Sequence, residues 1–355
     1  MEEQEYITAR LLSMPPYEQS AEADKLYMQA LQEELQFHYD HSEAYQQFCN
    51  RKGFDPHLPL MDIAQIPPVA VSVFKELGFS LASVPKEDIR LRLQSSATSG
   101  TPSTIVVDKE TSRRQAKAMV KVMQEVIGRE RKPFLVMDID PRSEFKALLG
   151  ARFAAITGYL NFASKAAYFL KANEKKVSYF DVEAMQGYLR SLPEEQPVVV
   201  FGFTYILYSQ VLKALQAADV KLRLPKGSKI IHIGGWKKLE SEKVEKRLFN
   251  LQLSESFGTE PTDVVDIYGF TEQMGLNYPD CPCGCKHTSN YVRVLVRDAQ
   301  TREVLPAGQE GMLEFITPVP HSYPGNAVLT DDLGYVLDEP CPCGRGGTRF
   351  VVTGR

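Results

Sequence analysis

The sequence predicts an α/β fold in which a mainly parallel sheet is flanked by helices. Two apolar runs, at residues 134–139 and 197–201, are bounded by proline or charged residues, as is typical of strands buried on both faces of a sheet. A third apolar run, at 229–233, precedes a glycine pair. Helical spacing follows the strands, for example over residues 205–218. Strands that alternate with helices in this way favour a parallel sheet.

The regions on either side of this core have a different character. Residues 21–51 place apolar side chains at helical spacing and predict one long amphipathic helix, which the proline-rich stretch 56–68 ends. From residue 291 onward, alternating apolar residues and the turn signal at 306–308 predict a β subdomain. We therefore expect three parts: a helical region over residues 1–90, an α/β core over 91–290 and a small β subdomain over 291–355.

Composition and charge exclude several classes of function. The 355 residues are 43% hydrophobic, which is enough for a substantial core, and the net charge of -4 is small. Basic residues are interspersed with acidic ones, so we expect no nucleic-acid partner. The acidic start of the chain is unlike a secretory signal, and no apolar run reaches membrane-spanning length. A cytoplasmic protein without a membrane span is the expectation.

Three short segments carry residue types that hold a nucleotide. The loop 95–103 is rich in serine and threonine, whose hydroxyl groups, with backbone N–H groups, suit phosphates. The run Tyr268-Gly269-Phe270-Thr271-Glu272 ends an apolar segment, and Asp332 precedes a turn where a carboxylate can take a ribose diol. Taken singly, such a loop is more often flexible, and Thr271 with Glu272 can open a helix as part of a capping arrangement. The occurrence of all three in this order favours nucleotide binding.

Together the three segments resemble the acyl-adenylate-forming (ANL) superfamily in order and rough spacing. The segment Gly234-Gly235-Trp236-Lys237 resembles the LuxE-type acyl-protein synthetases, and this likeness extends over nearly the whole chain. The stretches 268–272 and 341–345 are also similar to phenylacetate-CoA ligases. The resemblance implies the large N-terminal domain of an adenylating enzyme, with residues 91–290 as its adenylate-binding core.

The resemblance also implies a role for each motif residue. It assigns the β- and γ-phosphates of ATP to a set of small residues, namely Ser95, Ser96, Thr98, Ser99, Gly100 and Thr101. Tyr268, next to Gly269, would stack on adenine, Thr271 would bond the α-phosphate and Glu272 would hold Mg²⁺, a hard cation that prefers oxygen ligands. Asp332 would bind the ribose, with Arg355 near it.

The glycine pair has its own implied role. Gly234 and Gly235 would let the backbone pass close to the nucleotide and the acyl group, and Trp236 follows them in the same segment. The phosphate loop lacks the lysine that many relatives carry and has Ser103 there. Lys237 is therefore a candidate substitute in catalysis, and an ordinary surface lysine is the other interpretation.

Cysteine usage predicts a second kind of site. Cys49 lies alone in a predicted helix, whereas five cysteines cluster at 281–285 and 341–343, with His287 close by. In a reducing compartment this pattern favours zinc over disulfides, and free thiols in turns are the alternative. Six candidate ligands are available for four positions. The resemblance favours Cys281, His287, Cys341 and Cys343, with Cys283 and Cys285 as alternates, and a site filled by protein ligands is structural.

The resemblance implies activation of a carboxylic acid, in particular a fatty acid, to acyl-AMP, followed by transfer to a protein thiol. Two alternatives stay open: an aryl- or acyl-CoA ligase, and a non-catalytic adenylate-binding subunit of an acyl-transfer complex. Residues 201–208 either line an apolar acyl pocket or face the core. The sequence stops at Gly354-Arg355, where the resembled enzymes continue into a mobile domain or a tail with an acceptor cysteine. Two interpretations stay open: the chain is cut at the hinge, or another molecule supplies the acceptor.

Overall fold

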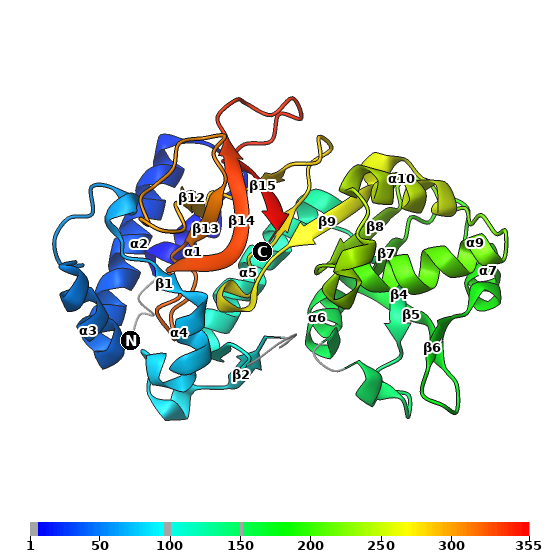
Figure 1. Ribbon diagram of the computed structural model, residues 1–355, viewed down its shortest axis with the longest axis horizontal. Coiled ribbons are helices and arrows are strands. Elements are labelled where there is room, and N and C mark those ends of the chain that lie inside the picture. The colour runs from blue at the N-terminus through cyan, green and yellow to red at the C-terminus, as the bar shows by residue number, and fades with distance from the viewer. Residues whose placement is uncertain (1–5, 96–100, 150–151, 355) are drawn as a thin grey trace. The chain divides into compact units, whose positions relative to one another are not determined.

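The computed structural model describes residues 6–95, 101–149 and 152–354 (Figure 1). The chain has an α/β fold and divides into two compact units. Unit 1 comprises Met1–Val122, Gly269–Tyr278 and Cys285–Arg355, and unit 2 comprises Met123–Tyr268 and Pro279–Gly284. The three-part division predicted from the sequence stays a prediction.

Unit 2 is built on the mainly parallel sheet that the sequence predicts. Its strand order is β10-β9-β8-β7-β4-β5-β6, in which β4, β5, β7, β8 and β9 run parallel and β6 is antiparallel to β5. The strands are β4 (Lys132–Ile139), β5 (Ala163–Ala172), β6 (Ser178–Phe180), β7 (Val199–Phe203), β8 (Lys229–Ile233), β9 (Val264–Tyr268) and β10 (Tyr278–Pro279). The three predicted apolar runs therefore correspond to β4, β7 and β8. The interiors of these strands are buried, as expected for a parallel sheet with both faces covered.

The helices of unit 2 connect successive strands. They are α6 (Arg152–Tyr159), α7 (Val182–Ser191), α8 (Thr204–Ile206), α9 (Lys213–Ala217) and α10 (Lys246–Phe257), coloured green to yellow in Figure 1. Between α8 and α9 the chain forms a π-helix over Leu207–Leu212, so the helix predicted at 205–218 is confirmed but contains one wider stretch.

The order of the parallel strands reverses direction at one point. From β4 the chain passes first to β5 on one side and later to β7 on the other side, so the reversal lies between β4 and β7. In open α/β sheets, ligands bind beyond the carboxyl ends of the strands at such a reversal. Asp138, near the end of β4, and Thr204, directly after β7, lie there.

Unit 1 contains an antiparallel sheet with the order β11-β15-β14-β13-β12 and with β1 parallel to β14. The strands are β1 (Val69–Ala70), β11 (Lys286–His287), β12 (Arg293–Arg297), β13 (Gly311–Ile316), β14 (Ala327–Leu337) and β15 (Arg349–Gly354). The alternation predicted beyond residue 291 is therefore confirmed. The predicted turn at 306–308 is also present, because Gln309 N–H donates to Pro306 O at 3.3 Å and Gly308 has φ +80°.

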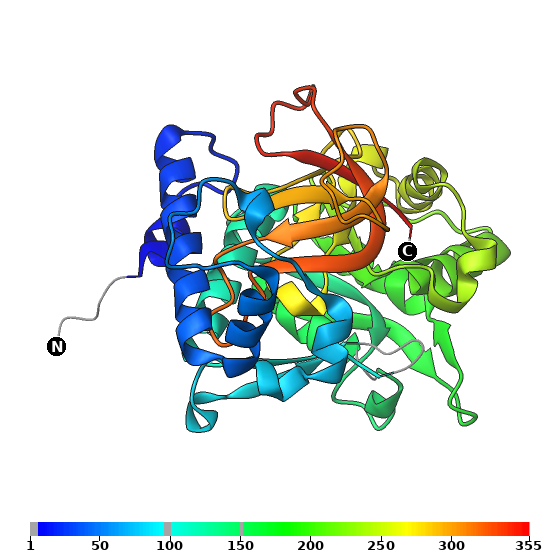
Figure 2. The ribbon, with the colours of Figure 1, turned by 60° about the vertical axis from the view of Figure 1, so that its left-hand side comes forward.

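The remaining elements of unit 1 are helical, apart from one hairpin. The helices are α1 (Ile7–Leu11), α2 (Ala21–His41), α3 (Glu43–Lys52), α4 (Val71–Glu76) and α5 (Lys109–Ile127), and the hairpin pairs β2 (Leu91–Gln94) with β3 (Thr104–Val107). Helix α2, in blue, lies against the antiparallel sheet, in orange, in both views (Figures 1 and 2). One contact that fixes this packing is the bond from the buried Tyr27 hydroxyl to Ile316 O, 3.0 Å long.

The single helix predicted over residues 21–51 is wrong, because the chain forms two helices that meet at Ser42. Ser42 is extended, with φ -122° and ψ 104°, and its N–H closes α2 by donating to His38 O at 2.9 Å. Its carbonyl accepts from Gln46 N–H and starts α3. The two helices are therefore separated by the extended main chain at Ser42, whose side chain makes no capping hydrogen bond.

A buried charge network ties α2 to α5 inside unit 1. Arg114 donates from Nη1 to Glu34 Oε1 and from Nε to Glu110 Oε1, both at 2.7 Å. The other oxygen of Glu34 lies 2.8 Å from His321 Nδ1. The side chains of Arg114 and Glu34 are each 1% exposed, so these charges are compensated by each other and by His321 and Glu110, not by solvent.

Candidate functional site

The Tyr-Gly-x-Thr-Glu motif forms the end of a parallel strand and the turn after it. Tyr268 is the last residue of β9, Gly269 is exposed, and Phe270 is extended with φ -142°. The 3₁₀ turn η9 (Thr271–Gln273) follows and is closed by the bond from Met274 N–H to Thr271 O at 3.1 Å. Thr271 is half-buried, whereas Glu272 is 5% exposed. The motif therefore places a buried carboxylate one residue after a hydroxyl at the carboxyl end of a strand.

The hydroxyl-rich loop is described only at its two ends. Ser95 and Ser103 close the β2–β3 hairpin, because Ser103 N–H donates to Ser95 Oγ at 2.9 Å and Ser95 N–H donates to Ser103 O at 3.0 Å. Thr101 is exposed next to this closure. Ser96, Thr98, Ser99 and Gly100 lie outside the described residues. The two described ends of the candidate phosphate loop are therefore joined at the end of the β2–β3 hairpin, in unit 1.

Asp332 lies at an irregular point of β14 in the same unit. The pairing of β13 with β14 shifts register between Met312 and Glu314, so that several residues of β14 lie opposite Leu313. Such a bulge changes the direction of side chains. Thr330 stabilises it, since its hydroxyl donates to Leu313 O at 2.9 Å and accepts from Asp332 N–H at 3.2 Å. Gly354 pairs with Leu333, and Arg355 itself lies outside the described residues.

The glycine pair lies at the end of β8 in unit 2. Gly234 has φ +75°, a conformation that glycine adopts without strain. Gly235 is exposed, and a Cβ built there would meet no atom within 4 Å. Trp236 is buried, with its ring 4.9 Å from that of Tyr208. Lys237 begins the 3₁₀ helix η7 (Lys237–Glu242), and its side chain lies outside the described part of the chain.

A polar cluster that the sequence did not predict lies at the carboxyl ends of β7 and β8. The Thr204 hydroxyl donates to Gly234 O at 2.6 Å, and Thr204 Oγ1 lies 2.9 Å from His232 Nδ1. His232 Nδ1 is also 3.6 Å from Asp266 Oδ1 on β9. The signal that could have revealed the cluster is positional: each of these residues lies in or directly after a parallel strand, near its carboxyl end.

A second group that the sequence did not predict lies near the reversal of strand order. Arg152 donates to both carboxylate oxygens of the buried Asp138, at 2.7 and 3.0 Å, and to the hydroxyl of Tyr205 at 3.0 Å. Burial raises the pKa of Tyr205, so its phenol stays protonated at neutral pH. Within the stretch 201–208, Phe201 and Leu207 are fully buried in the core, whereas Tyr205 and Tyr208 are half-buried.

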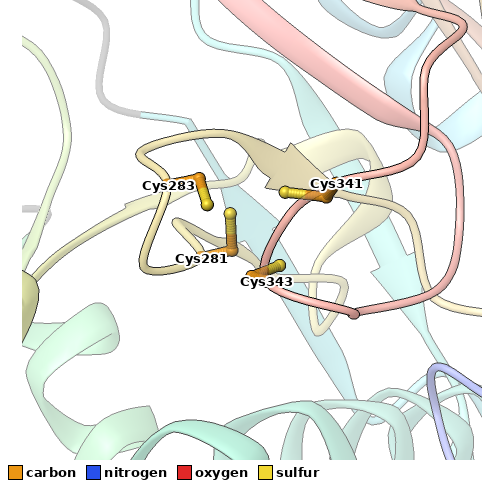
Figure 3. Close-up of side chains that lie close together, drawn as sticks. All are labelled: Cys281, Cys283, Cys341 and Cys343. Carbon is orange, nitrogen blue, oxygen red and sulfur yellow. The ribbon is translucent and has the colours of Figure 1, made fainter.

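Four cysteines come together at two similar turns (Figure 3). Each turn has the sequence Cys-Pro-Cys-Gly, and the glycines Gly284 and Gly344 have φ +73° and +74°. Each glycine N–H donates to the carbonyl of the first cysteine, at 2.8 Å for Cys281 and 3.0 Å for Cys341. The sulfur atoms all lie within 4.8 Å of one another and belong to Cys281, Cys283, Cys341 and Cys343.

The donor set of this cluster fits a tetrahedral zinc ion. Zn–S bonds of about 2.3 Å place tetrahedral sulfur atoms about 3.8 Å apart, a separation that is compatible with sulfur atoms lying no more than 4.8 Å from one another. Cys283, an alternate from the sequence, is the fourth member of the cluster. His287, the ligand favoured by resemblance, has Nε2 3.8 Å from Cys343 Sγ and Nδ1 2.9 Å from Gly346 O. Cys285 Sγ lies 3.9 Å from Arg349 Nη2.

No helix in the described ranges combines the length and apolar composition that crossing a membrane requires. Solved structures support the fold. A crystal structure of 2-hydroxyisobutyryl-CoA ligase in the postadenylation state with 2-HIB-AMP superimposes with a TM-score of 0.72 at 16% identity, covering 96% of this chain and 69% of the ligase. An open conformation of that ligase with 2-HIB-AMP and CoA gives 0.71 at 17% identity, covering 96% and 71%. At such identities the likeness establishes the fold alone.

Sequence relatives give the family. The family model described as "Acyl-protein synthetase, LuxE" matches residues 2–355. A long-chain-fatty-acid–luciferin-component ligase of Vibrio harveyi is 24% identical over 311 residues, which cover 86% of this chain and 77% of the relative. Its counterpart in Aliivibrio fischeri is 23% identical over 334 residues, or 92% and 82%. A family match over almost every residue, together with these relatives, means that the chain belongs to the LuxE acyl-protein synthetase family and is a ligase.

Proposed function

We propose that the chain activates a fatty acid with ATP and Mg²⁺ and passes the acyl group from acyl-AMP to a protein thiol. The observation that carries the proposal is the turn η9, in which Thr271 and the buried Glu272 follow a parallel strand in a chain of the LuxE family. The names of the two bacterial relatives, both long-chain-fatty-acid ligases, support a fatty acid as the substrate.

In the first half-reaction a carboxylate oxygen of the acid attacks the α-phosphorus of ATP. The new O–P bond forms as the bond to the β-phosphate breaks, and pyrophosphate leaves. Thr271 hydrogen-bonds the α-phosphate, and hydroxyl groups of the hairpin tip, from Ser95 to Thr101, bind the β- and γ-phosphates. Glu272 is the residue that would hold Mg²⁺, which neutralises phosphate charge when bound. The carboxylate of Asp332 takes the ribose hydroxyls, and Tyr268 stacks on adenine.

In the second half-reaction a thiolate sulfur attacks the acyl carbon of acyl-AMP. A C–S bond forms, the C–O bond to AMP breaks, and AMP leaves as the anion. The open space beside Gly235 supports a close approach of nucleotide or acyl group to the backbone at the end of β8.

The experiment that tests the proposal measures carboxylate-dependent exchange of pyrophosphate into ATP, over fatty acids of increasing length and aryl acids as a comparison. We expect exchange with long-chain acids. Absence of exchange with every acid would overturn the proposal and favour a chain that binds adenylate without activating an acid.

CoA is the alternative acceptor, because residues 268–272 and 341–345 are also similar to phenylacetate-CoA ligases. The two acceptors are distinguished by adding CoA after the adenylate has formed. CoA-dependent release of AMP would support the CoA ligase, whereas a hydroxylamine-sensitive acyl label on a partner protein would support the acyl-protein synthetase.

We also propose a structural zinc ion held by Cys281, Cys283, Cys341 and Cys343. The convergence of four sulfur atoms from two identical turn sequences supports this ligand set. Metal analysis should find about one zinc per chain. Cys283→Ser should lower the zinc content, while His287→Gln should retain it. Loss of zinc only in the histidine variant would restore His287 as the fourth ligand.

A further inference from the structure

The turn that carries Thr271 and Glu272 is held by two buried side chains. Tyr323 donates its hydroxyl to the main-chain oxygen of Glu272 at 2.8 Å. Gln273 donates from Nε2 to Phe315 O and to Gly325 O, both at 2.9 Å. Tyr323 and Gln273 are each 1% exposed. Leaving a buried carbonyl without its hydrogen-bond donor costs about 1–3 kcal/mol. These three hydrogen bonds therefore disfavour any other conformation of the turn.

Two glycines close the remaining space around the same turn. Gly275 has φ +88°, and a Cβ there would lie 2.7 Å from Gln115 O on α5. A Cβ at Gly325 would lie 2.5 Å from the Tyr323 ring and 3.0 Å from Glu272 O. Real Cβ atoms do not approach other atoms this closely. The turn η9 is therefore enclosed by Gln115 of α5, by Phe315 of β13 and by the 323–325 segment, all of which are residues of unit 1.

We infer that Tyr323 and Gln273 are positioning residues for adenylation, an inference that rests on the proposed function. Neither side chain is expected to touch ATP or the acid. They act through the main chain at Glu272, and so fix the directions of the Thr271 hydroxyl and the Glu272 carboxylate. Displacement of a reacting group by about 1 Å can lower a rate by about 100-fold, which is why such a fixed turn matters for catalysis.

The environment of Tyr323 keeps its hydroxyl protonated, as a hydrogen-bond donor must be. Burial, followed by the negative charge of Glu272, raises the pKa of its phenol. The hydroxyl is therefore protonated at every pH at which an enzyme of this kind is assayed, and it can donate to Glu272 O throughout. Its ring is also fixed, since it lies edge-on to Phe74 with the centroids 6.2 Å apart.

The test compares Tyr323→Phe with Tyr291→Phe. Tyr291 is a matched control in the same unit, because it is fully buried and its hydroxyl also donates to a main-chain carbonyl, Met14 O at 3.0 Å. Both variants lose a hydrogen bond from a buried tyrosine to a main-chain carbonyl, buried for Tyr323 and part-buried for Tyr291, so we expect similar losses of thermal stability. Only Tyr323→Phe should lower kcat of pyrophosphate exchange, by about 10-fold, and raise the Mg²⁺ concentration for half-maximal rate, with KM for the fatty acid unchanged.

Equal exchange rates and equal Mg²⁺ requirements in the two variants would overturn the inference. If Tyr323→Phe does not fold, Gln273→Met, which removes both bonds to Phe315 O and Gly325 O, is measured in its place. If the unaltered chain shows no exchange with any acid, the proposed function fails instead. Calorimetric titration with ATP and Mg²⁺ then decides the inference: weaker Mg²⁺-dependent binding in Tyr323→Phe than in Tyr291→Phe supports it, and equal binding overturns it.

Discussion

The two units bury polar groups in different places. In unit 1 the pairs Glu34–Arg114 and Arg297–Glu314 lie inside the core, and all four side chains are less than 10% exposed. In unit 2 the buried polar residues Asp138, Thr204 and His232 lie toward the carboxyl ends of parallel strands. The first group joins helices 80 residues apart through Glu34–Arg114 and neighbouring strands through Arg297–Glu314, whereas the second occupies the position where α/β sheets bind ligands.

This difference separates two uses of a buried polar group. A charge compensated on every side by the protein stabilises one arrangement of helices and strands, and its loss should appear as a loss of stability. A hydroxyl or carboxylate at the end of a parallel strand can also orient a ligand, and its change should appear mainly in activity. The predictions below test this separation.

The largest effect is expected for Arg114→Leu. The change leaves Glu34 buried beside His321 without its main countercharge, and breaking a buried pair costs about 3–5 kcal/mol. Chemical denaturation measures the free energy of unfolding. The neighbouring Arg113→Leu is the control, since Arg113 is about half exposed and pairs with Glu110 on the surface, where a pair contributes about 0–1 kcal/mol. Similar losses in both variants would contradict a structural role for the buried network.

The stability of unit 1 should depend on pH through two groups with opposite effects. Burial lowers the pKa of His38 to about 4, and the groups that interact with it electrostatically are Glu34, Arg114 and the His321 ring. A lowered pKa means that the neutral ring is favoured in the fold, so its contribution is present above about pH 6.5 and is lost as the pH falls through 4. Burial raises the pKa of Glu314 to about 7, opposed by Arg297. Its contribution is present below about pH 4.5 and is lost as the pH rises through 7.

Each of the two pKa shifts corresponds to about 3 kcal/mol in the free energy of unfolding. The effects of His38 and Glu314 on stability therefore largely cancel between pH 4.5 and 6.5. His38→Gln should leave only the Glu314 effect, and the free energy of unfolding should then fall as the pH rises across this window. Glu314→Gln should leave only the His38 effect, and the free energy should rise with pH. Denaturation at a series of pH values measures both slopes. Parallel profiles in the two variants would show that neither group titrates as its environment indicates.

The sequence predicted local features well and long-range ones poorly. The strands β4 and β8 were predictable because strands buried on both faces form continuous apolar runs. The break at Ser42 was missed because apolar spacing continues across it from Leu35 to Phe48. The bond between Thr204 and Gly234 O joins residues 30 apart, and the contact of Glu34 with His321 joins residues 287 apart. No local sequence pattern predicts such contacts.

The cysteines show the same limit. Spacing identified two short cysteine groups, but six side chains competed for four positions. The positive φ of Gly284 and Gly344 and the approach of the two turns decide which sulfur atoms meet. Both depend on the fold, so Cys283 could be given only as an alternate.

Glu272→Gln tests whether a buried acid of unit 1 can serve activity and not stability. Glu272 is as buried as the ion-paired residues of that unit, yet we expect its change to lower activity and to leave the fold intact, because it removes a charge and almost no volume. Exchange of pyrophosphate should fall by about 100-fold, the cost of losing one charge-stabilising group. Glu314→Gln, another buried acid of unit 1, is the control and should retain exchange. Unchanged exchange in Glu272→Gln would remove this residue from the Mg²⁺ role.

The smallest effect is expected for Thr204→Val in unit 2, which removes the hydroxyl that donates to Gly234 O and leaves the shape of the side chain unchanged. Loss of this donor frees the backbone at the glycine pair, and exchange should fall by about 10-fold. Ser228→Ala is the matched control. Ser228 is 1% exposed and donates to Pro225 O at the same 2.6 Å, but it precedes the amino end of β8. Each variant loses at least two hydrogen-bond contacts, because Thr204 Oγ1 also lies 2.9 Å from His232 Nδ1 and Ser228 Oγ also accepts from Val198 N–H at 3.0 Å, so the stability losses should be similar, at about 1 kcal/mol per bond. If stability and exchange fall equally in the two, the carboxyl end of the sheet has no special role, and the polar cluster around Thr204 is structural in the same sense as the ion pairs of unit 1.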